Sequence, residues 1–189
     1  MTPGQHFIIS WVCANSKELD RRSRVLITLS GLLPDLDGVG YVVDKLGLIV
    51  GYNTNLYEEY HHVFGHNLLV GILLSLLFAY YCKQRMAVFW LCLLAFHLHL
   101  VCDLAGSMGP DGYQWPIYYF YPFLPTYEVT WSGQWELSSW RNSAIGVFFF
   151  VVALFLARHR GVTFFDFFSK RFENKVAKVA MQRGFFKLN

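Results

Sequence analysis

Charged side chains are scarce in this sequence. The 189 residues include 16 Lys and Arg and 13 Asp and Glu, so charged residues make up 15% of the chain, whereas a soluble domain has about 25%. Hydrophobic residues account for 54% and aromatic residues for 19%, and the mean hydropathy is +0.33. This balance argues against an ordinary soluble domain and predicts a membrane protein whose polar connections are short.

Cysteine motifs and targeting signals are also missing. The four cysteines, Cys13, Cys82, Cys92 and Cys102, lie in apolar stretches without C-x-x-C spacing, so they indicate small buried hydrophobes and neither a disulfide framework nor a cysteine zinc site. The first residues, MTPGQHFIISWVCANSK, have neither a basic n-region nor an A-x-A site, so no cleavable signal peptide is expected. Without internal repeats, the length predicts one domain.

What the chain does contain is apolar stretches of helical length. Three are uncharged and have about 16 residues, slightly fewer than the roughly 20 that cross a bilayer; they are 67–82, 86–102 and 142–157. Two shorter stretches, 7–16 and 25–34, precede them, and Pro34 should end the second. We therefore predict an all-α fold: a membrane-embedded helical bundle with three main spanning helices, two shorter N-terminal helices and a C-terminal amphipathic helix.

The basic residues indicate how this bundle is oriented. Segment 17–24, loop 83–85 and the tail from Arg158 onward hold 14 of the 16 Lys and Arg. If the five stretches alternate in direction, these segments share one side, which the positive-inside rule makes cytoplasmic. Loop 103–141 then faces outward and carries the aromatic residues of a membrane interface, namely Trp115, Tyr118, Tyr119, Tyr121, Trp131, Trp135 and Trp140. We expect an integral protein of a bacterial inner membrane.

The C-terminal residues differ from the rest of the chain. The sequence FFDFFSKRFENKVAKVAMQRGFFKLN mixes Phe with Lys and Arg, which is typical of a basic helix on the inner membrane surface. We therefore divide the chain into a membrane domain, residues 1–160, and a basic amphipathic tail, residues 161–189.

Histidine and aspartate collect at the predicted outer ends of the helices. Four segments contribute to this layer: His6 begins the first stretch, Asp35 and Asp37 in GLLPDLDG follow the second, His61, His62 and His66 in HHVFGHN precede the third, and His99 and Asp103 close the fourth. Because these segments are distant in sequence, their convergence on one layer predicts a site near the outer, periplasmic face.

These residue types suit a metal ion. Imidazole and carboxylate without thiolate favour zinc, with iron or manganese as alternatives. Five or six ligands exceed the three or four of a single catalytic zinc, so one or two ions are expected, and two ions would share a bridging carboxylate. Asp103 is the natural bridge, because it lies one helical turn after His99 and its charge in an apolar helix needs a cation.

Two of the histidine assignments have alternatives. Helical spacing favours His62 with His66, four residues apart on one face. His61 and His66 converge only if His61 lies in a turn, which a break at Gly65 would allow. His97, two residues from His99, points to another side of the helix and is not expected to be a ligand.

The order of the motifs resembles a known family. Along roughly residues 1–160, the succession MTPGQH, LPDLD, HHVFGHN, HLHLVCDLAGSMGPDGYQWP and YPF resembles the membrane-bound metal-dependent hydrolases, which are similar to zinc-dependent phospholipase C. The resemblance implies an all-α fold and metal ligands at His6, Asp35, Asp37, His61, His66, His99 and Asp103. The family segment reads like H-R-G-x-T-H-S, so His62 takes the arginine position and becomes a group behind the ligands or an alternative ligand. The N-terminal amine that ligates metal in the soluble phospholipases is not carried over to Met1.

Two functional hypotheses follow. The first is a membrane-embedded hydrolase of a phosphoester, acting on a membrane lipid or lipid-linked substrate, in which Asp35 or Asp37 orients or deprotonates water. The second is a non-catalytic membrane protein with a structural or carrier metal site. A structural site would be closed by four ligands, so the surplus of carboxylates favours catalysis. A channel is disfavoured because the polar groups lie at one end of the span, and no nucleic-acid partner is expected.

Overall fold

The computed structural model describes residues 1–109 and 111–186, and this part of the chain is helical without any β-strand. The elements are α1 (Pro3–Asn15), α2 (Arg21–Ser30), the 3-10 helix η1 (Leu33–Val39), α3 (Gly40–Ile49), α4 (Leu56–Tyr60), α5 (Leu68–Tyr80), α6 (Arg85–Gly106), α7 (Trp140–Arg160), α8 (Phe165–Phe168) and α9 (Lys170–Gln182). The predicted all-α fold, its two short N-terminal helices and its amphipathic C-terminal helix are confirmed.

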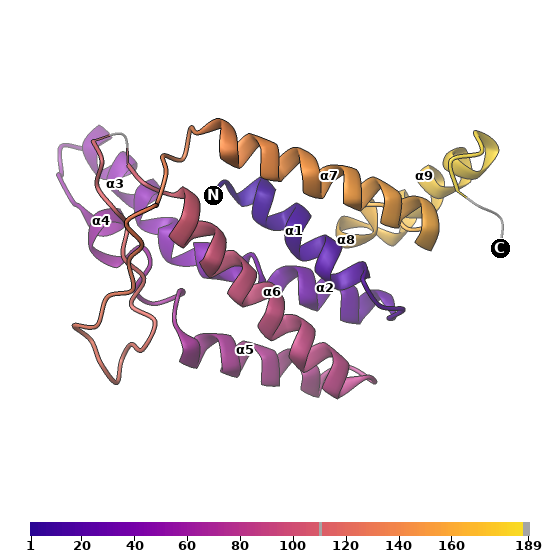
Figure 1. Ribbon diagram of the computed structural model, residues 1–189, viewed down its shortest axis with the longest axis horizontal. Coiled ribbons are helices and arrows are strands. Elements are labelled where there is room, and N and C mark those ends of the chain that lie inside the picture. Colours follow the sequence, from indigo (N-terminus) through magenta and orange to yellow (C-terminus); the bar gives the residue numbers. More distant parts are fainter. Residues whose placement is uncertain (110, 187–189) are drawn as a thin grey trace.

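Helix α6 lies at the centre of the bundle. It packs against α1, α2 and α5, and α1 packs in turn against α7. Successive long helices alternate in direction (Figure 1), so the α1–α2 and α5–α6 connections lie at one end together with α8 and α9. The opposite end holds the N-terminus, α3, α4 and the described residues of the long loop, 107–109 and 111–139. The basic segments therefore share one end of the molecule, as alternation predicts.

The spanning helices differ from those expected. By length and composition, α6 and α7 could cross a membrane, and the pair formed by α2 and residues 33–49, bent by 47°, is a third candidate. Stretch 67–82 forms only the 13-residue α5, which is about 20 Å long against a hydrocarbon core of about 30 Å. The side chain of Asn67 accepts a hydrogen bond from Val70 N and begins this helix late.

Small residues let the helices approach closely. Ala14, Ala95 and Ala153 are fully buried where helices cross. A Cβ atom on Gly31 would lie 2.0 Å from Ser10 Oγ, so only glycine fits where α2 ends against α1. Helix α2 therefore ends at Ser30, before Pro34, and the proline is the second residue of η1.

The start of the C-terminal tail is docked onto the bundle. The buried carboxylate of Asp166 in α8 forms ion pairs with Arg24 and Arg21 of α2. Glu173 at the start of α9 accepts hydrogen bonds from the backbone N and the hydroxyl of Thr163. The amphipathic helix α9 thus has a defined anchor at the basic end of the bundle.

Candidate metal centre

The predicted His and Asp residues come together at the end of the bundle where α1 begins and α6 ends. His6 lies in the second turn of α1, Asp35 and Asp37 lie on η1, His61, His62 and His66 lie in the connection between α4 and α5, and His99 and Asp103 lie in the last turns of α6. The apolar helices therefore carry four distant segments to one layer.

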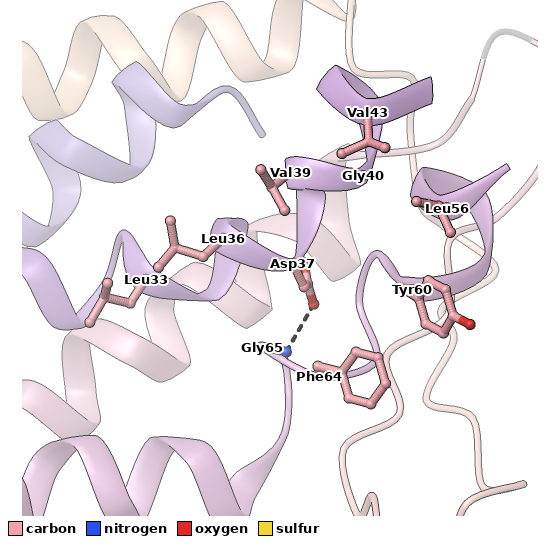
Figure 2. Close-up of a pocket in the computed structure, with 10 residues that line it drawn as sticks. All are labelled: Leu33, Leu36, Asp37, Val39, Gly40, Val43, Leu56, Tyr60, Phe64 and Gly65. Carbon is pink, nitrogen blue, oxygen red and sulfur yellow. Dashed lines mark hydrogen bonds between the residues drawn. The ribbon is translucent and has the colours of Figure 1, made fainter. Parts of the chain in front are cut away.

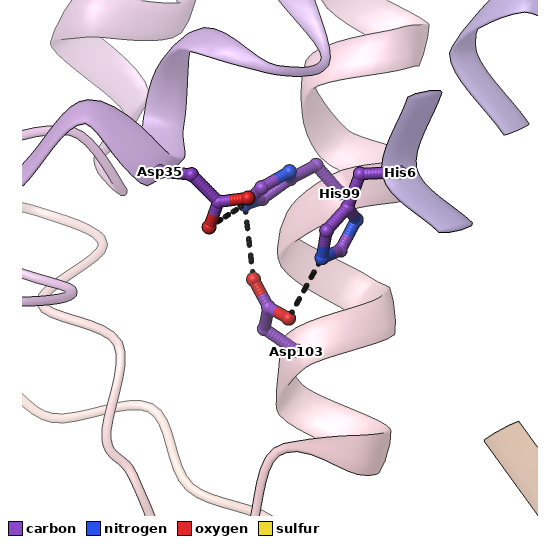
Figure 3. Close-up of side chains that lie close together, drawn as sticks. All are labelled: His6, Asp35, His99 and Asp103. Carbon is purple, nitrogen blue, oxygen red and sulfur yellow. Dashed lines mark hydrogen bonds and ion pairs between the residues drawn. The ribbon is translucent and has the colours of Figure 1, made fainter. Parts of the chain in front are cut away.

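A first group of possible ligands surrounds Asp103 on the α1 side (Figure 3). One ligand atom from each of His6, Asp35, His99 and Asp103 lies within 4.8 Å of the others. Asp103 Oδ1 is 3.1 Å from His6 Nε2, and Asp103 Oδ2 is 2.9 Å from His99 Nε2. Asp35 Oδ1 is 3.5 Å from His99 Nε2. These distances would let a metal ion take up two imidazoles and two carboxylates.

A second group includes the same aspartate. His62, His66 and Asp103 also offer ligand atoms within 4.8 Å of one another. Asp103 Oδ2 lies 3.5 Å from His66 Nε2 and 4.0 Å from His62 Nε2. All three side chains are buried. Asp103 is therefore common to both groups, which is the position that a bridging carboxylate occupies.

Ring orientation turns one nitrogen of His66 and one nitrogen of His99 toward each other. His66 Nδ1 is 2.9 Å from Asp37 Oδ2, and His99 Nδ1 is 2.9 Å from the carbonyl oxygen of Gly31. Both oxygens only accept, so each Nδ1 must donate its proton, and Nε2 of a neutral ring then carries a lone pair. These two Nε2 atoms are 3.1 Å apart. Beside a carboxylate, two such lone pairs can be bridged by a metal ion or by a proton on His66.

Unpaired buried atoms support the same conclusion. Over residues 1–109 and 111–186, four buried atoms of the site lack a hydrogen-bond partner: His6 Nδ1, Asp35 Oδ2, His62 Nδ1 and Asp103 Oδ2. A buried polar atom without a partner costs free energy comparable to a lost hydrogen bond. Metal coordination would satisfy the two carboxylate oxygens, so the donor set fits one or two divalent ions of the zinc type.

Asp37 lies behind the ligands. Its Oδ1 accepts from His61 Nδ1 and its Oδ2 accepts from His66 Nδ1 and from Gly65 N, each at 2.9 Å. A Cβ atom on Gly65 would lie 2.3 Å from the Pro34 carbonyl oxygen, so glycine is required for this approach. Neither Asp37 nor His61 belongs to either ligand group over the described residues. Asp37 orients His66 in the way that carboxylates commonly orient the histidine ligands of zinc sites.

The positions of His61 and His62 are decided by a turn. His62 has a φ of 71°, a left-handed conformation that is uncommon for residues other than glycine. The segment from His61 to Asn67 forms turns and bends, so His62 and His66 do not share a helix face as spacing predicted. His62 nevertheless points to Asp103, whereas His61 points to Asp37. The indole of Trp115, from the long loop, meets both imidazoles edge-on and covers them.

His62 and His66, in the connection between α4 and α5, differ in their charge at neutral pH. Burial lowers the pKa of His66, but the contacts with Asp103 and Asp37 outweigh burial and raise it to about 9. Burial, together with the neighbouring His66 and His61, holds the pKa of His62 well below its usual range. At neutral pH, His62 is a neutral donor, and a metal would displace the proton held by His66.

Two further contacts complete the site. The amino group of Met1 donates to Asp103 Oδ1, a neighbour that the motif pattern did not carry over. Gln134 Nε2 donates to the Asp103 carbonyl oxygen at 3.1 Å and ties the long loop to α6. His97 lies apart, as expected, with its nitrogens paired to the Leu93 carbonyl oxygen and to the Tyr119 hydroxyl.

Comparison with known proteins identifies the family. No curated protein and no solved structure matches the chain. The model of the YdjM inner membrane protein family matches residues 1–167. The matched range includes all the His and Asp residues of the site and ends within α8. The chain, with apolar helices long enough to span a bilayer, therefore belongs to the YdjM inner membrane protein family.

Proposed function

We propose that this protein is a membrane-embedded metal-dependent hydrolase that cleaves a phosphoester of a lipid or lipid-linked substrate. The observation that carries the proposal is the position of Asp103, which belongs to both groups of possible metal ligands. A carboxylate shared in this way would hold two ions at the short separation typical of two-metal hydrolytic sites. The resemblance of the motifs to membrane-bound metal-dependent hydrolases and to zinc-dependent phospholipase C favours the same reaction class.

Asp35 is the residue best suited to act on water. Its side chain is 23% exposed, whereas those of His99 and Asp103 are 0% and 3% exposed. Its Oδ2 lacks a hydrogen-bond partner among the described residues. A carboxylate in this position can accept a proton from an attacking water molecule. When bound, metal ions would lower the pKa of water and take up charge on the phosphoryl oxygens.

The remaining residues hold this arrangement in place. Asp37 orients the ring of His66, and the Gly31 carbonyl oxygen orients that of His99. Trp115 covers His61 and His62 and excludes water from that side. The partly exposed Asp35 then marks the open side, as catalytic metal sites require.

A structural or carrier metal site is the second candidate. Five of the eight predicted site residues are buried, and Asp35, Asp37 and His61 are half-buried. This burial would suit a closed structural site only if the open side at Asp35 were sealed. A structural ion would be held by four ligands without a spare carboxylate. The two readings thus differ in the number of ions and in turnover.

The test is a metal count combined with a hydrolysis assay. Detergent-purified protein is analysed for metal per chain, stripped with a chelator, reloaded with Zn²⁺ and assayed for phosphate or phospho-headgroup release from phospholipid vesicles. We expect up to two ions per chain and release that is lost on stripping and restored on reloading. One tightly held ion without release supports the structural reading, and protein that binds no metal overturns both.

A further inference from the structure

An apolar groove lies directly beside the metal centre (Figure 2). Its volume is about 500 Å³, within the range of ligand sites of small molecules. Leu36, Val39 and Val43 of η1 and α3 line one side, and Tyr60 and Phe64 line the other. Lys and Arg do not contribute to the lining over the described residues. The groove therefore suits a hydrocarbon chain and offers nothing to bind an anionic headgroup.

One carboxylate connects the groove to the metal centre. Asp37 lies in the groove lining and points to Gly65, whose N donates to Asp37 Oδ2 at 2.9 Å. The same Oδ2 accepts from His66 Nδ1. A molecule that fills the groove is thus separated from a candidate metal ligand by a single side chain.

The groove is preformed by the α3–α4 hairpin. Asp44 of α3 accepts hydrogen bonds from Thr54 Oγ1 and from the backbone N atoms of Leu56 and Tyr57, at 2.7–2.9 Å. A Cβ atom on Gly40 would lie 2.7 Å from Leu56 C, so glycine lets the two helices meet. Both walls are held by contacts within the chain and need no ligand to form.

The groove continues onto an exposed apolar face. Leu46 and Ile49 of α3 and Val50 directly after it are 58%, 80% and 69% exposed. A contiguous apolar face of this kind marks a contact with lipid or protein. Because the chain belongs to an inner membrane protein family, the acyl chains of the bilayer are the apolar partner that this face fits.

We propose that this groove holds an acyl chain of a membrane phospholipid and so presents the lipid's phosphoester to the metal centre. The substrate class is then a phospholipid that enters sideways from the bilayer, and a water-soluble phosphoester would lack the contact. The reaction itself rests on the function proposed above, whereas the binding of the chain does not.

Binding is tested without turnover. The protein is reconstituted in vesicles of phosphatidylethanolamine and phosphatidylglycerol that contain a trace of phosphatidylglycerol with a diazirine at the end of one acyl chain. After illumination, we expect labelled peptides to include Phe64. Val43→Trp fills the groove and should lower labelling of Phe64 about tenfold, because two buried methylenes carry that much binding free energy. Val42→Trp, exposed on the same helix outside the groove lining, should leave it unchanged.

Activity supplies the second measurement. With metal loaded, Val43→Trp should lose about tenfold in hydrolysis of a long-chain phospholipid, for the same reason, and should retain hydrolysis of a water-soluble short-chain analogue. Val42→Trp should match the parent protein on both. Metal content of the variants, measured in parallel, shows whether the centre itself is intact.

The outcomes separate the groove from the reaction. Phe64 labelling that is unchanged in Val43→Trp overturns the acyl site, as does an equal loss on long-chain and short-chain substrates. If Val43→Trp lowers labelling of Phe64 but the parent protein hydrolyses no phospholipid, the acyl site is retained and the proposed hydrolase is rejected.

Discussion

Nε2 of His66 and Nε2 of His99 lie 3.1 Å apart, and the other nitrogen of each ring already donates to an oxygen. The two residues are 33 positions apart in the chain, so only the packing of α6 against the start of α5 brings them together. Beside the buried carboxylate of Asp103, this pair of nitrogens is held either by the proton on His66 or by a metal ion that displaces it.

Removing the charge of Asp103 should empty part of the site. Asp103→Asn keeps the shape of the side chain but cannot balance two cations in a buried position. We expect the variant to insert and fold, to lose at least one metal per chain and to lose nearly all hydrolysis. Metal content of purified protein measures this, with the exposed Asp111→Asn as control. Full metal content and unchanged turnover in Asp103→Asn would refute the bridging role.

The two neighbouring histidines should differ in their effect. His62 points to Asp103, so His62→Ala should lower metal content. His61 contacts Asp37 instead, so His61→Ala should retain metal. Because the variant weakens only the support of His66, its affinity for Zn²⁺ should fall by about 10-fold or more, as for other groups that orient metal ligands. Titration of stripped protein with Zn²⁺ distinguishes them. The opposite result, with metal lost only in His61→Ala, would favour the assignment that the family pattern implies.

Gly65 should tolerate no side chain. A Cβ atom there would lie 2.3 Å from the Pro34 carbonyl oxygen and 3.1 Å from Asp37 Oδ2. Backbone at this distance must shift, so Gly65→Ala should reduce the free energy of unfolding by about 1–3 kcal/mol. Thermal unfolding in detergent measures the effect. Gly4→Ala is the matched control, because nothing lies within 4 Å of its Cβ position. Equal stability of the two variants would argue against the close approach of η1 and the 61–67 turn.

The basic end of the bundle should face the cytoplasm. Lys17 and Lys83 lie exposed at that end, and Tyr127 lies exposed in the loop at the opposite end. Under the positive-inside rule, a membrane-impermeant thiol reagent added to spheroplasts should label Tyr127→Cys and fail to label Lys17→Cys and Lys83→Cys. Labelling of either lysine position would reverse or reject this orientation.

Local patterns were sufficient for part of the fold. Apolar runs predict helices because the 3.6-residue period and the absence of charge are properties of neighbouring residues. The prediction of α6 and α7 as spanning helices therefore agrees with the structure, whereas that of stretch 67–82 was too long. Helices α3 and α4 were not predicted, since their polar and glycine residues interrupt the apolar pattern. Their hairpin depends on hydrogen bonds from Asp44 to residues ten and more positions away.

The sequence by itself determined that His99 and Asp103 share one face, because residues four apart on a helix always do. It also determined that His and Asp from four segments gather at one end, since alternating apolar helices leave their polar termini in layers. Only the tertiary structure decided that His62 points to Asp103 and His61 to Asp37. That choice depends on the left-handed conformation of His62 and on the close approach of Gly65 to η1. Both arise from packing between distant segments, so the spacing of residues along the chain does not reveal them.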